Sequence, residues 1–118
     1  MAVNLIDRTK LDACLDAEAD AIRAKLPASC YIIAMCVEGK TRSSEELARL
    51  MEDSVHQGGS HLVFLIGGSF GLHPSVKALA SFKLSMSPMT FPHHLARVML
   101  LEQVYRGYQI NNGSKYHK

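Results

Sequence analysis

The sequence predicts an α/β fold with a largely parallel sheet, because two kinds of segment alternate along the chain. One kind is short and continuously apolar, which is typical of strands that are covered on both faces. The other kind has apolar residues at every third or fourth position, which is typical of helices buried on one side. The 118 residues contain no repeat, low-complexity segment or obvious linker. We therefore expect one domain that spans residues 1–118.

Three segments are predicted to be strands. Residues 30–37 form an apolar run that Glu38-Gly39 closes, residues 61–66 form a second buried run, and residues 82–87 form a shorter third run. In parallel sheets, ligands bind beyond the carboxyl ends of the strands. The segments that follow these three runs are therefore the first places to look for function.

Four segments are predicted to be helices. Residues 9–26 carry apolar residues at helical spacing between Thr9, a suitable N-cap, and Pro27. The second helix begins at Ser43 and ends at Gly58-Gly59, with a buried stripe formed by Leu47, Leu50, Met51 and Val55. Ser43 and Glu46 have the spacing of a capping box. A short helix over residues 74–81 begins at Pro74, and a long last helix begins at Pro92, before a polar tail.

Composition excludes several classes of protein. No apolar run approaches the roughly 18 residues that a membrane span needs. The first ten residues lack the apolar core of a secretory signal, so we expect a cytoplasmic protein. The three cysteines, Cys14, Cys30 and Cys36, have no C-x-x-C spacing, which favours reduced thiols over disulfides or a zinc site.

The net charge of +2 hides an asymmetry along the chain. Residues 1–72 carry seven Lys/Arg and ten Asp/Glu, a balance of −3, whereas residues 73–118 carry six Lys/Arg and one acid, Glu102, a balance of +5. A basic half can bind a polyanion such as RNA, and it can equally be an ordinary solvated surface.

The glycine-rich segment 67–71, GGSFG, follows the second strand directly. It lacks both the G-x-G-x-x-G pattern and the lysine of a phosphate-binding loop, and Pro74 removes one amide from the start of the next helix. A tight turn with close approach of the backbone is the better interpretation.

Other candidate chemistry is weaker. His93 and His94 are adjacent and have no carboxylate at ligand spacing, Met86 and Met89 suit apolar packing better than copper binding, and no G-x-S-x-G supports a serine nucleophile. We therefore expect no metal. One cluster combines basic and aromatic residues that could stack on nucleic acid or simply form helix surface: Tyr105, Arg106, Tyr116 and His117.

Longer segments carry a specific resemblance. FLIGGSFGLHPSV, LSMSPMTFPHHLARVMLLEQVYRGYQI and the terminal YHK together resemble the bacterial ribosomal RNA large-subunit pseudouridine N3-methyltransferase family, one of the SPOUT methyltransferases. The match runs from about Tyr31 to Lys118. It implies a parallel α/β sheet with helices on both faces and a C-terminal deep trefoil knot, an exception to the rule that folds are unknotted. It also implies a homodimer that transfers a methyl group from S-adenosylmethionine to a pseudouridine of ribosomal RNA or the ribosome, with neither DNA nor a membrane as partner.

The resemblance assigns residues to the cofactor and to the substrate. The cofactor-binding set is Met35, Gly67, Gly68, Met86, Ser87, Pro88, Met89, Thr90 and Phe91. S-adenosylmethionine carries a sulfonium cation, so Gly67 and Gly68 would let the backbone approach the cofactor closely rather than bind an anion. Pro88 and Pro92 would stiffen the loop. The residues that would face the substrate are Arg106, Tyr116 and His117. His117 could assist loss of the ring proton, but no dedicated general base is expected.

The sequence differs from this family at its N-terminus. Family members normally begin with a further strand and helix, which are apparently absent here. The alternative interpretation is therefore a shortened homologue that binds RNA or ribosomes without methylating them.

Overall fold

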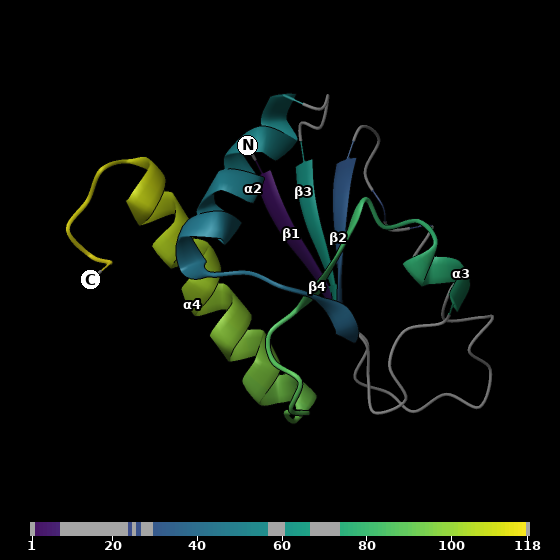
Figure 1. The fold of residues 1–118 in the computed structure, drawn as a ribbon. Coiled ribbons are helices and arrows are strands. Elements are labelled where there is room, and N and C mark those ends of the chain that lie inside the picture. Colours follow the sequence, from purple (N-terminus) through teal and green to yellow (C-terminus); the bar gives the residue numbers. More distant parts are fainter. Residues whose placement is uncertain are drawn as a thin grey trace.

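The computed structural model describes residues 2–7, 24, 26, 30–56, 61–66 and 74–117. Its centre is a four-stranded sheet in which every pairing is parallel and the strand order is β1-β3-β2-β4 (Figure 1). The prediction of an α/β fold with a parallel sheet is confirmed. The strands are β1 (Ala2–Asp7), β2 (Cys30–Thr41), β3 (His61–Ile66) and β4 (Phe82–Ser85).

β1 is a strand that the sequence pattern did not predict. Its apolar run is short and Asn4 interrupts it, so residues 2–7 carry little signal of their own. The segment is extended because it pairs along its whole length with β3, from Ala2 opposite His61 to Asp7 opposite Ile66. Tertiary pairing, rather than local propensity, therefore defines this strand.

β2 is longer than predicted, and the expected end at Glu38-Gly39 was wrong. The strand continues to Thr41 through an irregularity between Met35 and Lys40 in its pairing with β4. Gly39 makes this possible, because a Cβ at that position would lie 2.7 Å from the carbonyl oxygen of Lys83. Glycine thus lets two backbones approach where a turn was expected.

Two further predicted boundaries are corrected. The strand predicted over residues 82–87 ends at Ser85, where the Ser85 hydroxyl donates to the carbonyl of Ser87 and the chain turns away from the sheet. The helix predicted over residues 74–81 is the single turn α3 (Pro74–Lys77), closed by a bond from Ala78 N–H to the carbonyl of Pro74.

The second predicted helix is confirmed as α2 (Ser44–His56). Its capping box is complete, because Ser43 N–H donates to Glu46 at 2.8 Å and Glu46 N–H donates to the Ser43 hydroxyl at 3.1 Å. Leu47 and Met51 are buried and Leu50 is partly buried, as predicted. The helix predicted over residues 9–26 lies almost wholly outside the described residues.

The last helix is α4 (His93–Asn111), with Pro92 as its N-cap residue. It ends where the Asn112 and Gly113 amides donate to the carbonyls of Tyr108 and Ile110. Gly113 has a φ of 72°, in the left-handed region that glycine adopts without strain at helix ends.

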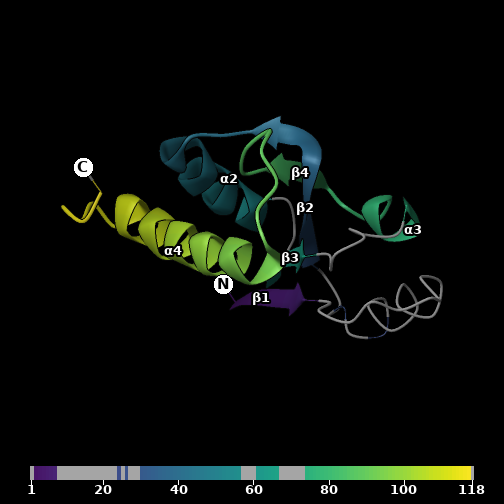
Figure 2. The same ribbon diagram turned by 90° about the horizontal axis from the view of Figure 1, so that it is seen from below.

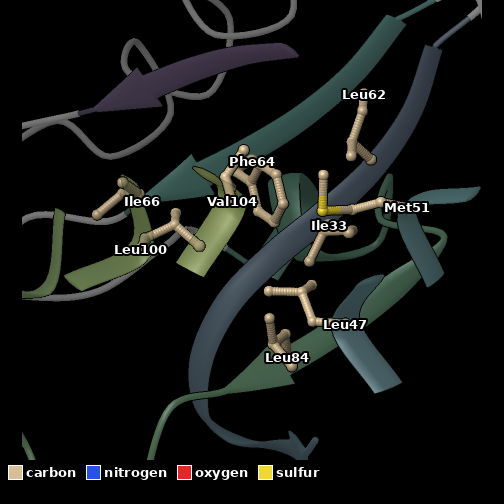
Figure 3. Close-up of a cluster of buried hydrophobic side chains, with 9 residues drawn as sticks. All are labelled: Ile33, Leu47, Met51, Leu62, Phe64, Ile66, Leu84, Leu100 and Val104. Atoms are coloured by element: carbon tan, nitrogen blue, oxygen red, sulfur yellow. The ribbon is translucent and has the colours of Figure 1, made fainter. Parts of the chain in front are cut away.

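α2 and α4 pack side by side on one face of the sheet (Figures 1 and 2). Figure 3 shows the buried cluster between them and the strands, which consists of Ile33, Leu47, Met51, Leu62, Phe64, Ile66, Leu84, Leu100 and Val104. Burial of this apolar surface is the main force that fixes α4 against β4 and α2. The core therefore determines where both ends of α4 lie.

The opposite face of the sheet carries a second buried cluster. It comprises Ile32, Ala34, Val63 and Leu65, with Leu26 and Ala80 packed against it. α3 lies on this side, away from α2 and α4 (Figure 2). The trefoil knot that the resemblance implies stays a prediction, because residues 67–73 lie outside the described part of the chain.

Candidate functional site

The strand register brings the predicted cofactor segments to one edge of the sheet. Met35 pairs with Ile66, the last residue of β3, and with Leu84 of β4. The loop that begins at Met86 directly follows Ser85, the last residue of β4, and Gly67 directly follows Ile66. Gly67 and Gly68 themselves lie outside the described residues. Met35 and Met86 are both partly buried against the core of this edge.

The loop over residues 86–91 is shaped by short-range hydrogen bonds. Ser85 Oγ donates to the carbonyl of Ser87 at 3.0 Å, and the Met89 amide donates to Ser87 Oγ at 3.0 Å. Met89 is 71% exposed, although it is apolar. Pro88 and Thr90 are also exposed, so the tip of the loop offers main chain and apolar surface to a ligand.

A pocket of about 510 Å³ lies between this loop, α2 and α4. Its wall includes charged, polar and apolar groups from three segments, namely Arg42, Ser43 and Ser44 before and at the start of α2, Ser85 and Met86 at the end of β4, and Glu102 and Gln103 of α4. Its volume lies within the range of small-molecule sites, and its wall mixes apolar side chains with a few hydroxyl groups, as such sites do. Of the predicted cofactor residues that the structure describes, only Met86 lines this pocket.

The three residues that were predicted to face the substrate lie together. Arg106 Nη1 and His117 Nδ1 are 3.1 Å apart, and the Arg106 guanidinium lies over the Tyr116 ring, 4.9 Å from its centroid. The polar tail therefore folds back along α4, and Tyr105 packs edge-on against Tyr116 with a centroid separation of 4.9 Å. The assignment of Arg106, Tyr116 and His117 to the substrate stays a prediction.

Glu102 lies at the centre of the hydrogen bonds of this cluster. Its carboxylate accepts two hydrogen bonds from Arg106, through Nε and Nη2 at 3.1 Å each, and one from the Tyr116 hydroxyl at 2.9 Å. The Gln103 amide also donates to it, at 3.2 Å. The spacing of Glu102 and Arg106, four residues apart on a helix, is a signal that sequence alone contains.

Glu45 is a second acid that the sequence analysis did not include in the site. It stands in the first turn of α2, and its carboxylate contacts Nε2 of His117. The two residues are 72 positions apart, so no local pattern could have predicted their contact. The cluster thus joins α2, α4 and the tail.

Hydrogen bonds shift the pKa values of several groups in the cluster. The Arg106 guanidinium, followed by the Tyr116 hydroxyl, holds the pKa of Glu102 below its ordinary value. The same carboxylate raises the pKa of Arg106 and of Tyr116, because it stabilises their protonated forms. The hydrogen bond from His117 lowers the pKa of Glu45.

The cofactor loop and the substrate cluster adjoin different ends of α4 (Figure 1). The loop enters the helix at Pro92, whereas Arg106 lies 14 residues later, or about 21 Å along the axis at 1.5 Å per residue. A reaction between two groups requires them about 3 Å apart. Arg106 therefore lies far along the helix from the end of the loop at Pro92, although Met86 at the start of the loop and Glu102 of the cluster line one pocket.

α4 also exposes an apolar stripe on the side opposite its core contacts. Leu95, Val98, Leu101 and Tyr105 recur at helical spacing and are 49%, 62%, 46% and 51% exposed. The residues of α4 that face the core, Leu100 and Val104, lie on the other side of the helix. Both faces of α4 are thus apolar. Within the described chain the core covers one of them, and Tyr116 contacts the other at Tyr105.

Within the described residues, no three His, Cys, Asp or Glu side chains gather as metal ligands would. His94 is exposed, and nothing is described of the His93 side chain. No described helix has the length and apolarity to cross a membrane.

The described chain thus combines a parallel α/β sheet, a pocket between β4, α2 and α4, and a basic-aromatic cluster on its last helix. The family model described as predicted SPOUT methyltransferase matches residues 3–117, and the chain belongs to this family. The chain is 50% identical over 103 residues to the ribosomal RNA large subunit methyltransferase H of Clostridioides difficile, covering 87% of this chain and 65% of that protein.

Two further relatives are also described as large-subunit ribosomal RNA methyltransferases. The protein of the same description from Clostridium novyi is 50% identical over 101 residues, covering 86% of this chain and 64% of that protein. The putative ribosomal RNA large subunit methyltransferase H of Methanococcus vannielii is 44% identical over 113 residues, covering 96% and 69% respectively. The chain thus spans less than two thirds of the length of the first two curated relatives.

Proposed function

We propose that the chain is an S-adenosylmethionine-dependent methyltransferase that acts on N3 of a pseudouridine in large-subunit ribosomal RNA, in the cytoplasm. The observation that carries this proposal is the gathering of Arg106, Tyr116 and His117 into one hydrogen-bonded cluster on a chain of the SPOUT family. The curated relatives are named as large-subunit ribosomal RNA methyltransferases, which supports the same substrate. The C-terminal trefoil knot is part of this proposal and rests on family membership.

In this proposal the edge of the sheet holds the cofactor. Gly67 and Gly68 would supply close main chain, Met35 and Met86 would supply apolar surface, and the residues from Ser87 to Phe91 would close over the adenosine. S-adenosylmethionine, when bound, supplies an activated methyl group. The chain contributes alignment and a fixed polar environment, and no metal is required for either.

The substrate cluster would bind RNA. The Arg106 guanidinium can take a phosphate or a base oxygen through paired N–H groups, and Tyr116 can stack on a base. The Tyr116 hydroxyl and the His117 ring are held in place by Glu102 and Glu45, so their orientation is set before substrate arrives. A site oriented in advance loses less entropy on binding.

The separation along α4 supports a site shared between two copies of the chain. A contact through the stripe of Leu95, Val98, Leu101 and Tyr105 about a two-fold axis perpendicular to α4 would place two α4 helices antiparallel. The Pro92 end of one helix would then lie near the Arg106 region of the other. The cofactor loop of one copy and the substrate cluster of the other would then meet.

The direct test uses labelled S-adenosylmethionine and ribosomes that lack the modification. We expect label in large-subunit RNA, and we expect substitution of Arg106 or His117 by Ala to depress transfer much more than it weakens cofactor binding. Binding of ribosomes without any transfer would instead establish the alternative, a homologue that binds RNA without methylating it.

A further inference from the structure

His117 is held at both nitrogens of its ring, and its two neighbours determine where the ring proton lies. Arg106 Nη1 lies 3.1 Å from Nδ1. A guanidinium has only donors, so Nδ1 must be the acceptor and cannot carry a proton in this arrangement. The proton of the neutral ring is therefore on Nε2, where the carboxylate of Glu45 accepts it.

Glu45 stands on a rigid support. It is flanked by Ser44 and Glu46 in the first turn of α2, and the capping box of Ser43 and Glu46 fixes that turn. Ser44 itself donates to the Gln103 side chain of α4 at 2.6 Å. The backbone of Glu45 is thus held relative to α4 by contacts that do not involve the tail.

The arrangement is similar to that in a catalytic triad, where a carboxylate accepts a hydrogen bond from one ring nitrogen of a histidine and thereby orients the other ring nitrogen toward its partner. Here the other nitrogen supports Arg106. Arg106 has five N–H groups, and three of them have a described partner. Nε and Nη2 each donate one N–H to Glu102, and Nη1 donates one to His117. Among the described residues, no identified contact takes the second N–H of Nη1 or of Nη2, so these two groups can donate to an incoming oxygen.

We propose that Glu45 is a positioning residue for the substrate face: it holds His117 as the tautomer protonated on Nε2, and His117 in turn orients Arg106 and anchors the tail to α2. The effect on RNA rests on the proposed function, but the contact itself does not. In this state His117 acts as a neutral support for Arg106 and has no ring nitrogen free to accept a proton from substrate.

The contact is tested by nuclear magnetic resonance on the full chain with ¹⁵N-labelled histidine, with the His117 signals assigned by their loss in His117→Ala. In the native chain we expect a protonated Nε2 whose N–H signal is visible, because a carboxylate that accepts the proton slows its exchange with water. In Glu45→Ala that signal should disappear, and the backbone of residues 114–117 should become mobile in ¹⁵N relaxation. Glu45→Gln, which retains an acceptor oxygen, should give an intermediate result.

Glu52→Ala is the matched control, because Glu52 is an exposed acid on the same helix and no described contact involves it. It should leave the His117 signal and the tail unchanged. An unchanged Nε2–H signal and an ordered tail in Glu45→Ala would overturn the proposal.

The activity measurement separates this inference from the proposed function. Glu45→Ala should bind S-adenosylmethionine as the native chain does but lower transfer to ribosomes by about tenfold, by analogy with loss of the carboxylate that orients a metal-bound histidine, with partial rescue by Glu45→Gln. Loss of the Nε2–H signal with full transfer would contradict the positioning role. If the native chain transfers nothing, the proposed function fails, and the resonance data still decide whether Glu45 holds His117.

Discussion

Tyr116 and Arg106 share one carboxylate oxygen: the phenol of Tyr116 donates to Glu102 Oε2 at 2.9 Å, and Arg106 Nη2 donates to the same oxygen at 3.1 Å. The tail is therefore attached to α4 through an acid, which makes its attachment sensitive to pH. The pKa of Glu102 is lowered from its ordinary value of 4.5, chiefly by Arg106 and then by Tyr116. The stabilisation is complete above the ordinary value and is lost as the pH falls through the lower, folded-state value.

We predict that acidification below about pH 4.5 releases the tail. The Tyr116 ring signals should move toward those of a mobile residue over that range, as followed by nuclear magnetic resonance. Glu102→Ala, which removes the acceptor of the Tyr116 hydroxyl, should release the Tyr116 ring already at neutral pH, and the transition that remains should be that of the Glu45–His117 contact. A Tyr116 ring that stays ordered in Glu102→Ala would contradict the assigned role of this carboxylate.

Gly107 of α4 faces the side chain of Met51 in α2. A Cβ at position 107 would lie 2.7 Å from the Met51 sulfur, and Met51 is only 1% exposed, so it has little room to move. Gly107→Val should therefore lower the free energy of unfolding by about 1–3 kcal/mol through overpacking. Denaturant titration measures this effect.

Gly113→Asn is the matched control at the end of the same helix. A Cβ there meets nothing within 4 Å, and asparagine tolerates the positive φ of 72°. It should leave the free energy of unfolding nearly unchanged. Equal stability of the two variants would mean that α2 and α4 do not pack as described.

The exposed stripe of α4 leads to a prediction about assembly. Leu101→Glu places a charge in the middle of the stripe, where burial in a dimer would require the charge to lose its water. We expect the native chain to be a dimer and Leu101→Glu to be a folded monomer, as measured by light scattering and circular dichroism. Leu79→Glu, which alters a residue that is 38% exposed after α3, should remain dimeric. A native monomer at micromolar concentration would exclude this interface.

Cofactor binding should stabilise the folded chain. A ligand that binds only the native state at 100 times its Kd adds about 2.7 kcal/mol, so saturating S-adenosylmethionine or S-adenosylhomocysteine should raise the Tm by several degrees. Gly68→Val should remain folded but lose this rise, because a branched side chain would prevent close approach of the backbone. A native chain with no Tm shift and no heat of binding by calorimetry would contradict the cofactor assignment.

Much of the fold could be predicted because its local signals agree with its tertiary structure. The capping box of Ser43 and Glu46 and the apolar run of β3 specify their elements within a few residues. β1 and residues 38–41 of β2 could not be predicted, since they are extended through pairing and through the close approach at Gly39. Nonlocal contacts are invisible to a pattern of residues along the chain.

The same distinction applies to the candidate site. Arg106, Tyr116 and His117 were found through resemblance, and the structure places them together. Glu102 could be paired with Arg106 from helical spacing, but Glu45 could not be paired with His117 across 72 positions. The roles of all these residues in substrate binding remain predictions.

The central claim is that each methyl-transfer site combines the cofactor loop of one copy with the substrate cluster of another. Two inactive variants test it most directly: Gly68→Val, which should lose the cofactor, and Arg106→Ala, which should lose the substrate. Each variant alone should transfer no label to ribosomes. After unfolding and refolding together in equal amounts, half of the dimers are mixed, and each mixed dimer has one intact shared site. We predict recovery of about one quarter of native transfer. If the site lay within a single chain, the mixture would stay inactive although native protein transfers label, and that result would contradict the account.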